Sequence, residues 1–416
     1  MGLLKKVETK KPLSSRQASG GGQISSQRPV QAPKAPPCNG ICPSGNDVRG
    51  WLTVVAQREK LSLALPEALD AAFMVAAETN PFPSVMGRIC PAPCEGVCNR
   101  KEKDEAVSIA QSERWIGDWA LQRDLPLPKV EGAIPRTEKV AVVGAGLSGL
   151  SCAYQLARRG YPVDLYEAGT VAGGTLRSSV PGAKLPPSVL DAEIGRVLAL
   201  GVTFHPGCRL GGDLSLPELQ GSHAAVVLAV GTESPSGPSG ANGANEAAGG
   251  AAGTADGWGR TAVAGLFFAG SDAEVAAGSV AAGRRAALAL DAFLRGTELA
   301  PAHALPTIGP ERIKKSAYAA IPRTAPNLRT PEAQTADPLL EQDMGFTEEQ
   351  LLTESSRCFS CGMCFDCEKC WMFCQNECFS KVPAAERGKY YRMVLDACIG
   401  CKKCAAVCPS GFLDWV

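Results

Sequence analysis

Apolar positions recur with helical spacing through the first third of the chain. Within residues 46–60, Val48, Leu52 and Val55 fall on one face of a helix. An Asn-Asp pair stands just before them, and both residue types cap helix N-termini. The pattern predicts a helical domain over residues 36–130, which also holds five cysteines.

A strand–helix–strand pattern follows. The apolar run at 139–143 predicts a buried strand, residues 147–160 a helix that ends at a glycine, and residues 162–167 a second strand. The same kind of pattern continues to residue 232 and returns over 261–297. We therefore expect a Rossmann-like α/β domain at 137–297.

The remaining segments are of two kinds. Residues 1–35 are rich in Pro, Gly, Ser and Gln and predict an extended arm, whereas 233–260 is a low-complexity linker of Gly, Ala and Ser inside the α/β domain. Residues 298–350 are rich in proline and predict a partly extended connector. Residues 351–416 form a second cysteine-dense module. The predicted fold class is α/β with added helical and α+β modules.

Composition narrows the function. The 42 basic and 42 acidic residues give no charge bias towards nucleic acid or a membrane surface, and no apolar run is long enough to span a membrane. The 18 cysteines would suit a secreted disulfide scaffold, but no apolar segment follows the basic N-terminus as it would in a signal peptide. We therefore expect a cytoplasmic protein whose cysteines bind metal.

A glycine motif lies between the first strand and its helix. Gly144, Gly146 and Gly149 form GxGxxG, and Glu167 ends the next strand. In the dinucleotide-binding fingerprint the glycines allow the tight turn, the approach of the pyrophosphate and close helix packing, and the acid binds the ribose. The alternative is a glycine-rich turn without a ligand.

Two further segments favour FAD over NAD. The sequence Gly174-Thr175-Leu-Arg177 lies shortly after Glu167. Flavoproteins have a second glycine turn at this position, and it passes the flavin phosphates. Gly270 and Asp272 follow a predicted strand, where flavoproteins of this type hold the ribityl chain.

The last 60 residues contain two cysteine runs with bacterial ferredoxin spacing. In such pairs the fourth cysteine of each run ligates the cluster of the other run. The first predicted [4Fe–4S] set is Cys364, Cys367, Cys370 and Cys408. The second is Cys374, Cys398, Cys401 and Cys404. Zinc is the alternative metal, because CxxC pairs also bind zinc.

From residue 36 to 297 the chain resembles the glutamate synthase small subunit and its relatives, among them the iron–sulfur part of dihydropyrimidine dehydrogenase. The resemblance rests on CPAPCEGVC at 90–98 with NPFP before it, on GGTLRSSVPGAKLPPSVLDAEI at 173–194, and on LAVGT at 228–232. It implies an FAD site that includes Gly231, and two [4Fe–4S] clusters in the helical domain.

The resemblance also implies ligands for those two clusters. One would take Cys42, Cys90, Cys94 and Glu113, unless Glu113 is an ordinary surface glutamate. The other would take Cys38 and Cys98 plus two cysteines from an upstream RCxxCG segment. Residues 1–37 contain no cysteine, but Arg357-Cys358-Phe-Ser-Cys361-Gly362 has this pattern. We expect Cys358 and Cys361 to complete the cluster; otherwise these four thiols are free, which gives three clusters instead of four.

One departure from the family decides the expected function. Relatives insert a nicotinamide-binding domain where this chain has only the 233–260 linker, and no second GxGxxG occurs. NAD(P)H binding is therefore not expected. The C-terminal module resembles that of the iron–sulfur flavoprotein that accompanies dissimilatory sulfite reductase. We expect an electron-transfer subunit with protein redox partners in a larger complex. A stand-alone flavoenzyme and a structural adaptor remain as alternatives.

Overall fold

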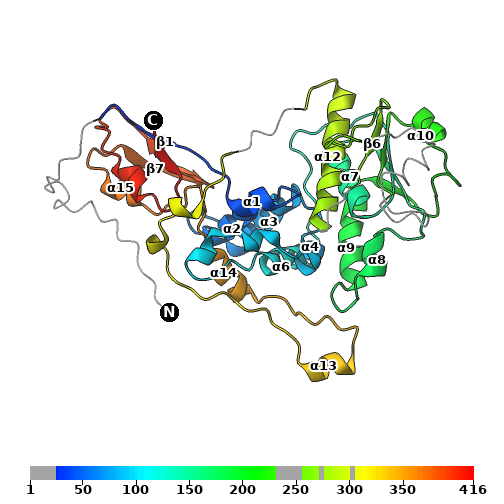
Figure 1. Cartoon of the computed structure of the whole chain (residues 1–416), viewed down its shortest axis with the longest axis horizontal. Helices are drawn as coiled ribbons and strands as arrows, with labels where there is room; N and C mark the ends of the chain where they lie inside the picture. Colours follow the sequence, from blue (N-terminus) through cyan, green and yellow to red (C-terminus); the bar gives the residue numbers. More distant parts are fainter. Residues whose placement is uncertain (1–24, 231–254, 271–275, 300–304) are drawn as a thin grey trace.

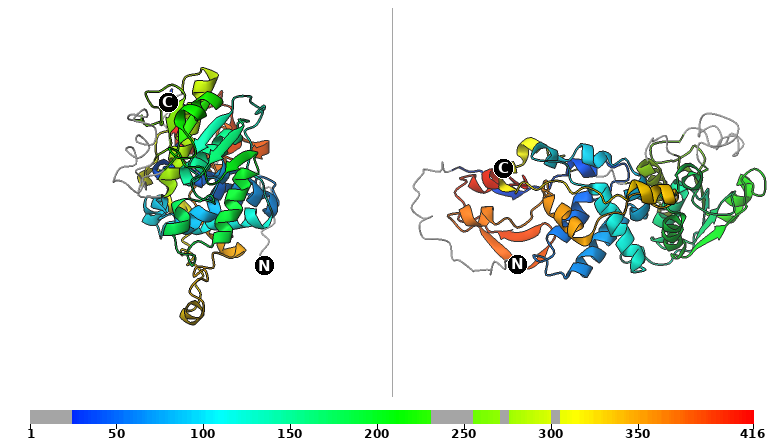
Figure 2. Two further views of the ribbon diagram at one scale, coloured as in Figure 1. Left: turned by 90° about the vertical axis from the view of Figure 1, so that its right-hand side faces the viewer. Right: turned by 90° about the horizontal axis from the view of Figure 1, so that it is seen from below.

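The computed structural model describes residues 25–230, 255–270, 276–299 and 305–416. Three parts lie in a row (Figures 1 and 2). A ferredoxin-like domain occupies one end, a helical domain the middle, and a Rossmann-like domain the other end. These parts have the architecture predicted from the sequence.

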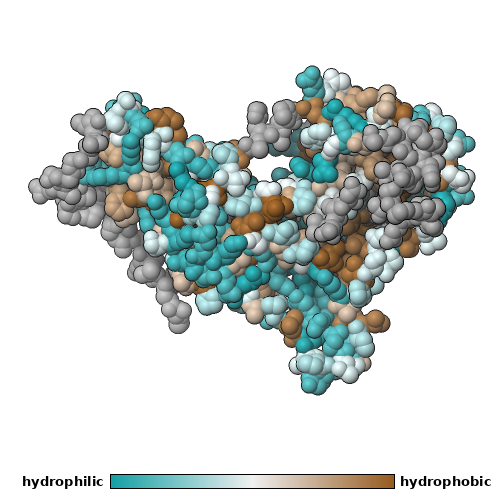
Figure 3. Space-filling model, in the orientation of Figure 1, coloured by the Kyte–Doolittle hydropathy of each residue, from teal (hydrophilic) through white to brown (hydrophobic). Residues whose placement is uncertain are grey.

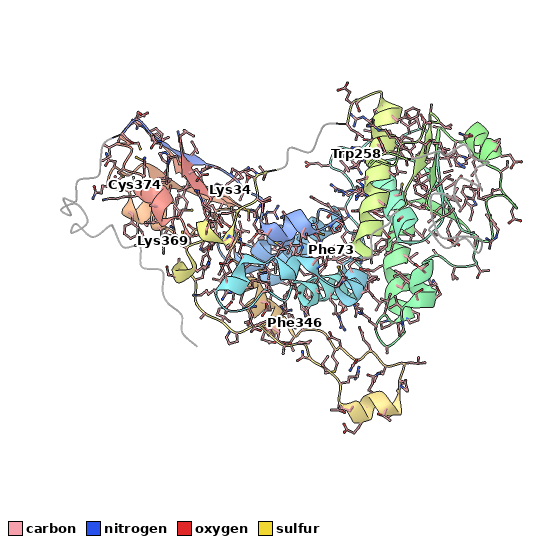
Figure 4. The ribbon with its side chains drawn as sticks, viewed as in Figure 1. Lys34, Phe73, Trp258, Phe346, Lys369 and Cys374 are labelled. Carbon is pink, nitrogen blue, oxygen red and sulfur yellow. The ribbon has the colours of Figure 1, made fainter. Side chains whose placement is uncertain are left out.

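The helical domain surrounds an apolar core. Its helices are α1 (Pro37–Ile41), α2 (Val48–Ala56), α3 (Leu65–Ala77), α4 (Pro83–Ile89), α5 (Pro93–Gly96) and α6 (Ile109–Gln122), with a 3₁₀ turn at Asn99–Glu102. The helix expected near residue 48 is confirmed as α2. The Asp47 carboxylate caps it by accepting a hydrogen bond from the Gly50 N–H at 3.0 Å. Trp51 of α2 and Phe73 of α3 are both buried in the core (Figure 4).

The Rossmann-like domain contains a parallel sheet with the order β4-β3-β2-β5-β6. Its strands are β2 (Val140–Val143), β3 (Val163–Tyr166), β4 (Val202–His205), β5 (Ala225–Leu228) and β6 (Leu266–Phe268). The central strand β2 is entirely buried. Its neighbours in the sheet are β3 and β5, one on each side. The chain builds β3 and β4 on one side of β2 and then β5 and β6 on the other, so the loop after β2 lies at a switch point, where α/β sheets bind ligands.

Helices cover the sheet. They are α7 (Leu147–Ala157), α8 (Thr175–Ser179), α9 (Pro187–Leu198), α10 (Leu216–Ser222) and α12 (Ala276–Arg295). Helices α7 and α12 run side by side (Figure 1). At their closest approach a side chain on Gly283 would lie 2.0 Å from the carbonyl oxygen of Ser148. Only glycine allows these two helices to pack so closely.

The ferredoxin-like domain combines the first described strand with the last segment of the chain. It comprises α15 (Lys369–Phe373), β7 (Phe379–Glu386), β8 (Lys389–Met393), α16 (Lys403–Val407) and β9 (Leu413–Trp415). Strand β1 (Pro29–Gln31) pairs antiparallel with β9. Lys34 then places its Nζ 2.7 Å from the Asp414 carboxylate (Figure 4). The described part of the N-terminal arm is therefore bound to the last strand.

The connector returns from the Rossmann-like domain to the ferredoxin-like domain. It contains 3₁₀ turns at Pro310–Arg312 and Lys315–Ala317, then α13 (Pro331–Ala336) and α14 (Glu348–Arg357). Helix α13 projects from the body (Figure 1), and its far end is part of the surface in Figure 3. Leu339, three residues after this helix, is 77% exposed. Helix α14 packs against α2 and α6. Among the described helices, none has the length and apolar character needed to cross a membrane.

One buried carboxylate joins the Rossmann-like and helical domains. Glu193 of α9 accepts hydrogen bonds at 2.9 Å from the backbone N–H groups of Ser84 and Val85, at the start of α4.

We expect Glu193→Ala to lower the free energy of unfolding by about 2 kcal/mol, because two buried donors lose their acceptor. Thermal denaturation measures this loss. Glu218→Ala, at the exposed start of α10, is the control and should cost about 0.5 kcal/mol. Equal losses from the two variants would contradict this role of Glu193.

Candidate metal centres and dinucleotide site

The candidate metal ligands lie in four groups, each around a cavity of its own. The end quartet consists of Cys374, Cys398, Cys401 and Cys404. The second quartet consists of Cys364, Cys367, Cys370 and Cys408. The shared quartet consists of Cys38, Cys98, Cys358 and Cys361. The carboxylate quartet consists of Cys42, Cys90, Cys94 and Glu113. The structure thus brings together the same four sets that we predicted from spacing and resemblance.

The donor chemistry of these cavities fits a bound metal cluster. Burial raises the pKa of Cys358 and Cys90 to about 11 and that of Cys361 and Cys364 to about 12. A thiol binds metal as the thiolate. These thiols are therefore mostly protonated at neutral pH and ionise more readily when a cation compensates the charge. Four such thiols around one cavity form a soft, anionic site when metal binds.

The four members of each quartet line a common cavity instead of converging on one point. The ligands of one zinc ion converge to about 2.3 Å from it. Over the ranges that the structure describes, no group of three or more His, Cys, Asp and Glu side chains is arranged to hold a single metal ion. Each quartet instead surrounds a cavity, as the four ligands of a cubane do.

The N-terminal arm covers the end quartet. Gln27 and Arg28 line its cavity, and the Ser25 hydroxyl donates to the carbonyl oxygen of Gly400 at 2.9 Å. The end quartet lies at the far end of the molecule from the Rossmann-like domain, as the position of Cys374 shows (Figure 4).

Positive and polar groups surround the shared quartet. Arg49 donates to the carbonyl oxygen of Cys361 at 2.5 Å, and the Asn99 amide lies 3.6 Å from the Cys361 sulfur. Arg100 also lines this cavity and lies over the Phe359 ring at 5.0 Å. Cations and hydrogen-bond donors beside ligating sulfur stabilise the reduced, more negative form of a cluster.

The carboxylate quartet contains a half-buried glutamate. Glu113 of α6 accepts hydrogen bonds from the amides of Asn46 at 2.6 Å and Asn80 at 2.9 Å. Burial raises the pKa of Glu113 to about 7. Glu113 also lines the cavity with the other three members of its quartet, whereas an ordinary helix-surface glutamate is solvated.

We expect Glu113→Ala to remove one cluster, so that iron falls from about 16 to about 12 atoms per chain. The reason is that this cavity then offers only three thiols. Iron assay and electron paramagnetic resonance of the reduced protein measure the change. Gln122→Ala, on the exposed end of the same helix, is the control. Full iron content and an unchanged spectrum in Glu113→Ala would exclude Glu113 as a ligand.

The four cavities are neighbours in series. Phe379 lines both the end and the second cavity, and Val48 lines both the shared and the carboxylate cavity. Between the second and shared cavities, the Tyr318 ring contacts Phe359 of one and Phe365 of the other, at centroid distances of 4.3 and 5.5 Å. Ala277 of α12, in the Rossmann-like domain, lines the carboxylate cavity.

The glycine loop after β2 is shaped to approach a phosphate. A side chain on Gly149 would lie 1.8 Å from the carbonyl oxygen of Gly144, which itself has a φ of +104°. A side chain on Gly146 would meet no atom within 4 Å. Glycine at 144 and 149 therefore closes the turn, and the space beside Gly146 is open to a ligand. The Glu167 carboxylate accepts a hydrogen bond from the Ala145 N–H at 2.7 Å, so it lies beside this loop.

The other dinucleotide candidates are distributed around this loop. Gly174 lies against it, since a side chain there would be 3.0 Å from the Cα of Gly146. Thr175 begins α8, and Arg177 donates to the carbonyl oxygen of Ala172 at 2.5 Å and pairs with Asp191. The remaining candidates comprise Gly270, which follows β6, and two residues outside the described ranges, Gly231 and Asp272.

Family models match each of the three parts. Residues 7–125 match the 4Fe–4S cluster domain II of dihydropyrimidine dehydrogenase. Residues 142–195 match an NAD(P)-binding Rossmann-like domain, and residues 392–414 match a 4Fe–4S binding domain. The chain therefore carries 4Fe–4S domains on both sides of a Rossmann fold, and the predicted fold class is confirmed.

Curated relatives agree with these models. The glutamate synthase [NADPH] small chain of Azospirillum brasilense is 35% identical over 202 residues, which are 47% of this chain and 39% of the relative. This chain is a homologue of the glutamate synthase small chain. A dihydropyrimidine dehydrogenase subunit, PreT of Salmonella typhimurium, is 34% identical over 48% of this chain and 46% of its own length.

The beta subunit of NADP(+)-dependent formate dehydrogenase from Moorella thermoacetica is 34% identical over 48% of this chain and 30% of its own length. The predicted resemblance is thus confirmed, and the chain spans less than half the length of each of these three relatives.

Proposed function

We propose that this chain is an electron-transfer subunit that relays electrons between an FAD in the Rossmann-like domain and partner redox proteins through four [4Fe–4S] clusters. The observation that carries the proposal is the series of four cavities lined by candidate metal ligands. The series begins at α12 of the Rossmann-like domain and ends under the described part of the N-terminal arm. Each cluster carries one electron at a time, whereas a flavin exchanges two, so such a series passes the electrons singly.

Two features support a partner protein as donor or acceptor. Homologues of this chain have names that identify them as subunits, among them the PreT subunit and the formate dehydrogenase beta subunit. The sequence has no second glycine motif for a nicotinamide nucleotide. A reducing compartment such as the cytoplasm would keep the candidate ligands reduced.

Anaerobic reduction of the purified chain tests the proposal. We expect about 16 irons and one FAD per chain, with clusters that are reduced by dithionite or reduced ferredoxin and not by NADPH or NADH. Rapid flavin reduction by NADPH in the single chain would favour the stand-alone flavoenzyme. Clusters that no reductant reduces would favour a structural role.

The flavin is tested separately at Gly149. We expect Gly149→Val to abolish FAD binding, because its side chain would collide with the Gly144 carbonyl in the phosphate loop. The absorbance of extracted flavin and the iron content measure the two cofactors independently, and iron should stay near that of the unmodified protein. Gly195→Ala on α9 is the control, since its added carbon meets no atom within 4 Å. Unchanged FAD in Gly149→Val would contradict this site.

A further inference from the structure

The end cavity contains a fifth cysteine. Cys378 is 3% exposed and lines this cavity together with the four cysteines of the end quartet. Its backbone N–H donates to the sulfur of Cys374 at 3.3 Å. A [4Fe–4S] cluster requires four protein ligands, so one thiol here exceeds the number that ligation uses.

The backbone fixes Cys378 in this place. It follows a left-handed turn at Glu377, which has a φ of +53°, and directly precedes β7. The Val394 N–H donates to the Cys378 carbonyl oxygen at 2.9 Å, so the paired strand β8 continues into this contact. The thiol donates a long hydrogen bond to the carbonyl oxygen of Asn376 at 3.7 Å, and the side chain packs in the apolar core of the domain. It is held beside the cavity and is almost fully buried.

The other cavities differ in this respect. Within the described residues, the second, shared and carboxylate cavities are lined by no cysteine beyond their proposed ligands. The additional thiol is therefore a feature of the end cavity alone. This cavity is also the farthest of the four from the Rossmann-like domain, as the position of Cys374 shows (Figure 4). An additional donor at one cluster of a series changes the electron distribution along the whole series.

We propose that Cys378 is a positioning residue of the end cluster that does not bind iron. With the cluster bound, its S–H exchanges the long hydrogen bond to Asn376 for one to a sulfur of the cluster or of its ligands. This inference rests on the proposed function, because it requires a cluster in the end quartet. A reduced cluster carries one more negative charge than the oxidised one, so a donor to its sulfur stabilises the reduced form. Cys378 thereby raises the reduction potential of the end cluster and favours electrons at the end of the molecule that lies under the arm.

Redox titration of the intact holoprotein tests this role, with Cys378→Ala, Cys378→Ser and the control Cys208→Ala in the Rossmann-like domain. Iron is assayed first, and electron paramagnetic resonance then follows the potential of each cluster. We expect full iron in all variants, a more negative potential for one cluster in Cys378→Ala, and recovery towards the original value in Cys378→Ser, which keeps a donor.

Three results would overturn the inference. An unchanged potential in Cys378→Ala shows that the thiol has no effect on the cluster. A loss of about four irons in this variant identifies Cys378 as a ligand. An unmodified protein with no cluster in the end quartet overturns the proposed function together with the inference, and the iron assay distinguishes this case from the other two.

Discussion

The double variant Cys358→Ser/Cys361→Ser should lose one whole cluster, with iron falling from about 16 to about 12 atoms per chain. Both thiols line the shared cavity with Cys38 and Cys98, although more than 250 residues separate the two pairs along the sequence. Burial and the nearby thiols Cys358, Cys98 and Cys361 raise the pKa of Cys38 well above its usual value. Removal of half of the donors leaves a pair that cannot hold a cubane.

Iron assay and the spectrum of the reduced protein measure this loss. Cys152→Ser/Cys208→Ser is the matched control, because it also removes two thiols but neither lines a quartet cavity. We expect the control to keep about 16 irons. If Cys358→Ser/Cys361→Ser also keeps its full iron content, the hypothesis that Cys358 and Cys361 complete a cluster with Cys38 and Cys98 is wrong.

Local sequence was enough to predict the modules. The strand and glycine motif at 139–149 and the two cysteine runs after residue 364 are local features, and their structures depend on local spacing. The shared quartet was predicted in a different way. Spacing alone does not relate Cys98 to Cys358, and only the resemblance of Arg357–Gly362 to a missing family segment suggested the pairing.

The groups that surround the cavities could not be predicted. Arg49 and Asn99 approach Cys361 from other elements, and Tyr318 comes from the connector. These side chains reach the sites through tertiary packing, which leaves no periodicity in the sequence. Cys378 was visible as an unassigned cysteine, but its place in the end cavity depends on the turn at Glu377 and on strand pairing.

Arg357→Leu should lower the free energy of unfolding by about 3–5 kcal/mol and make the shared cluster easier to lose. Arg357 and Glu354 of α14 have fully buried side chains and pair at 2.8 Å. The guanidinium also donates to the carbonyl oxygens of Glu105 at 2.7 Å and Ile321 at 3.0 Å. These contacts join the segment that carries Cys358 to the helical domain, so the variant leaves a buried carboxylate without its countercharge.

The exposed pair Lys389–Glu386 is the matched control. It has the same sequence separation of three residues and the same distance of 2.8 Å, but its side chains are 76% and 71% exposed. Lys389→Leu should change the free energy of unfolding by less than about 1 kcal/mol, since water screens such pairs. Thermal denaturation of the holoproteins compares the two variants, and iron assay after mild heating reports cluster loss. Similar small effects from both would show that α14 does not depend on this pair.

A double variant separates the contribution of the ion pair from that of the two backbone hydrogen bonds that Glu354 accepts. Arg357→Leu/Glu354→Leu removes both charges, so the uncompensated carboxylate of the single variant is absent. The backbone N–H groups of Ser108 and Thr324 still lose Glu354 as their acceptor, at a cost of about 1–3 kcal/mol each. We therefore expect the double variant to be no more stable than Arg357→Leu. A large recovery would mean that the ion pair, and not the acceptance of these two N–H groups, is the main contribution of Glu354 to the junction between α14 and the helical domain.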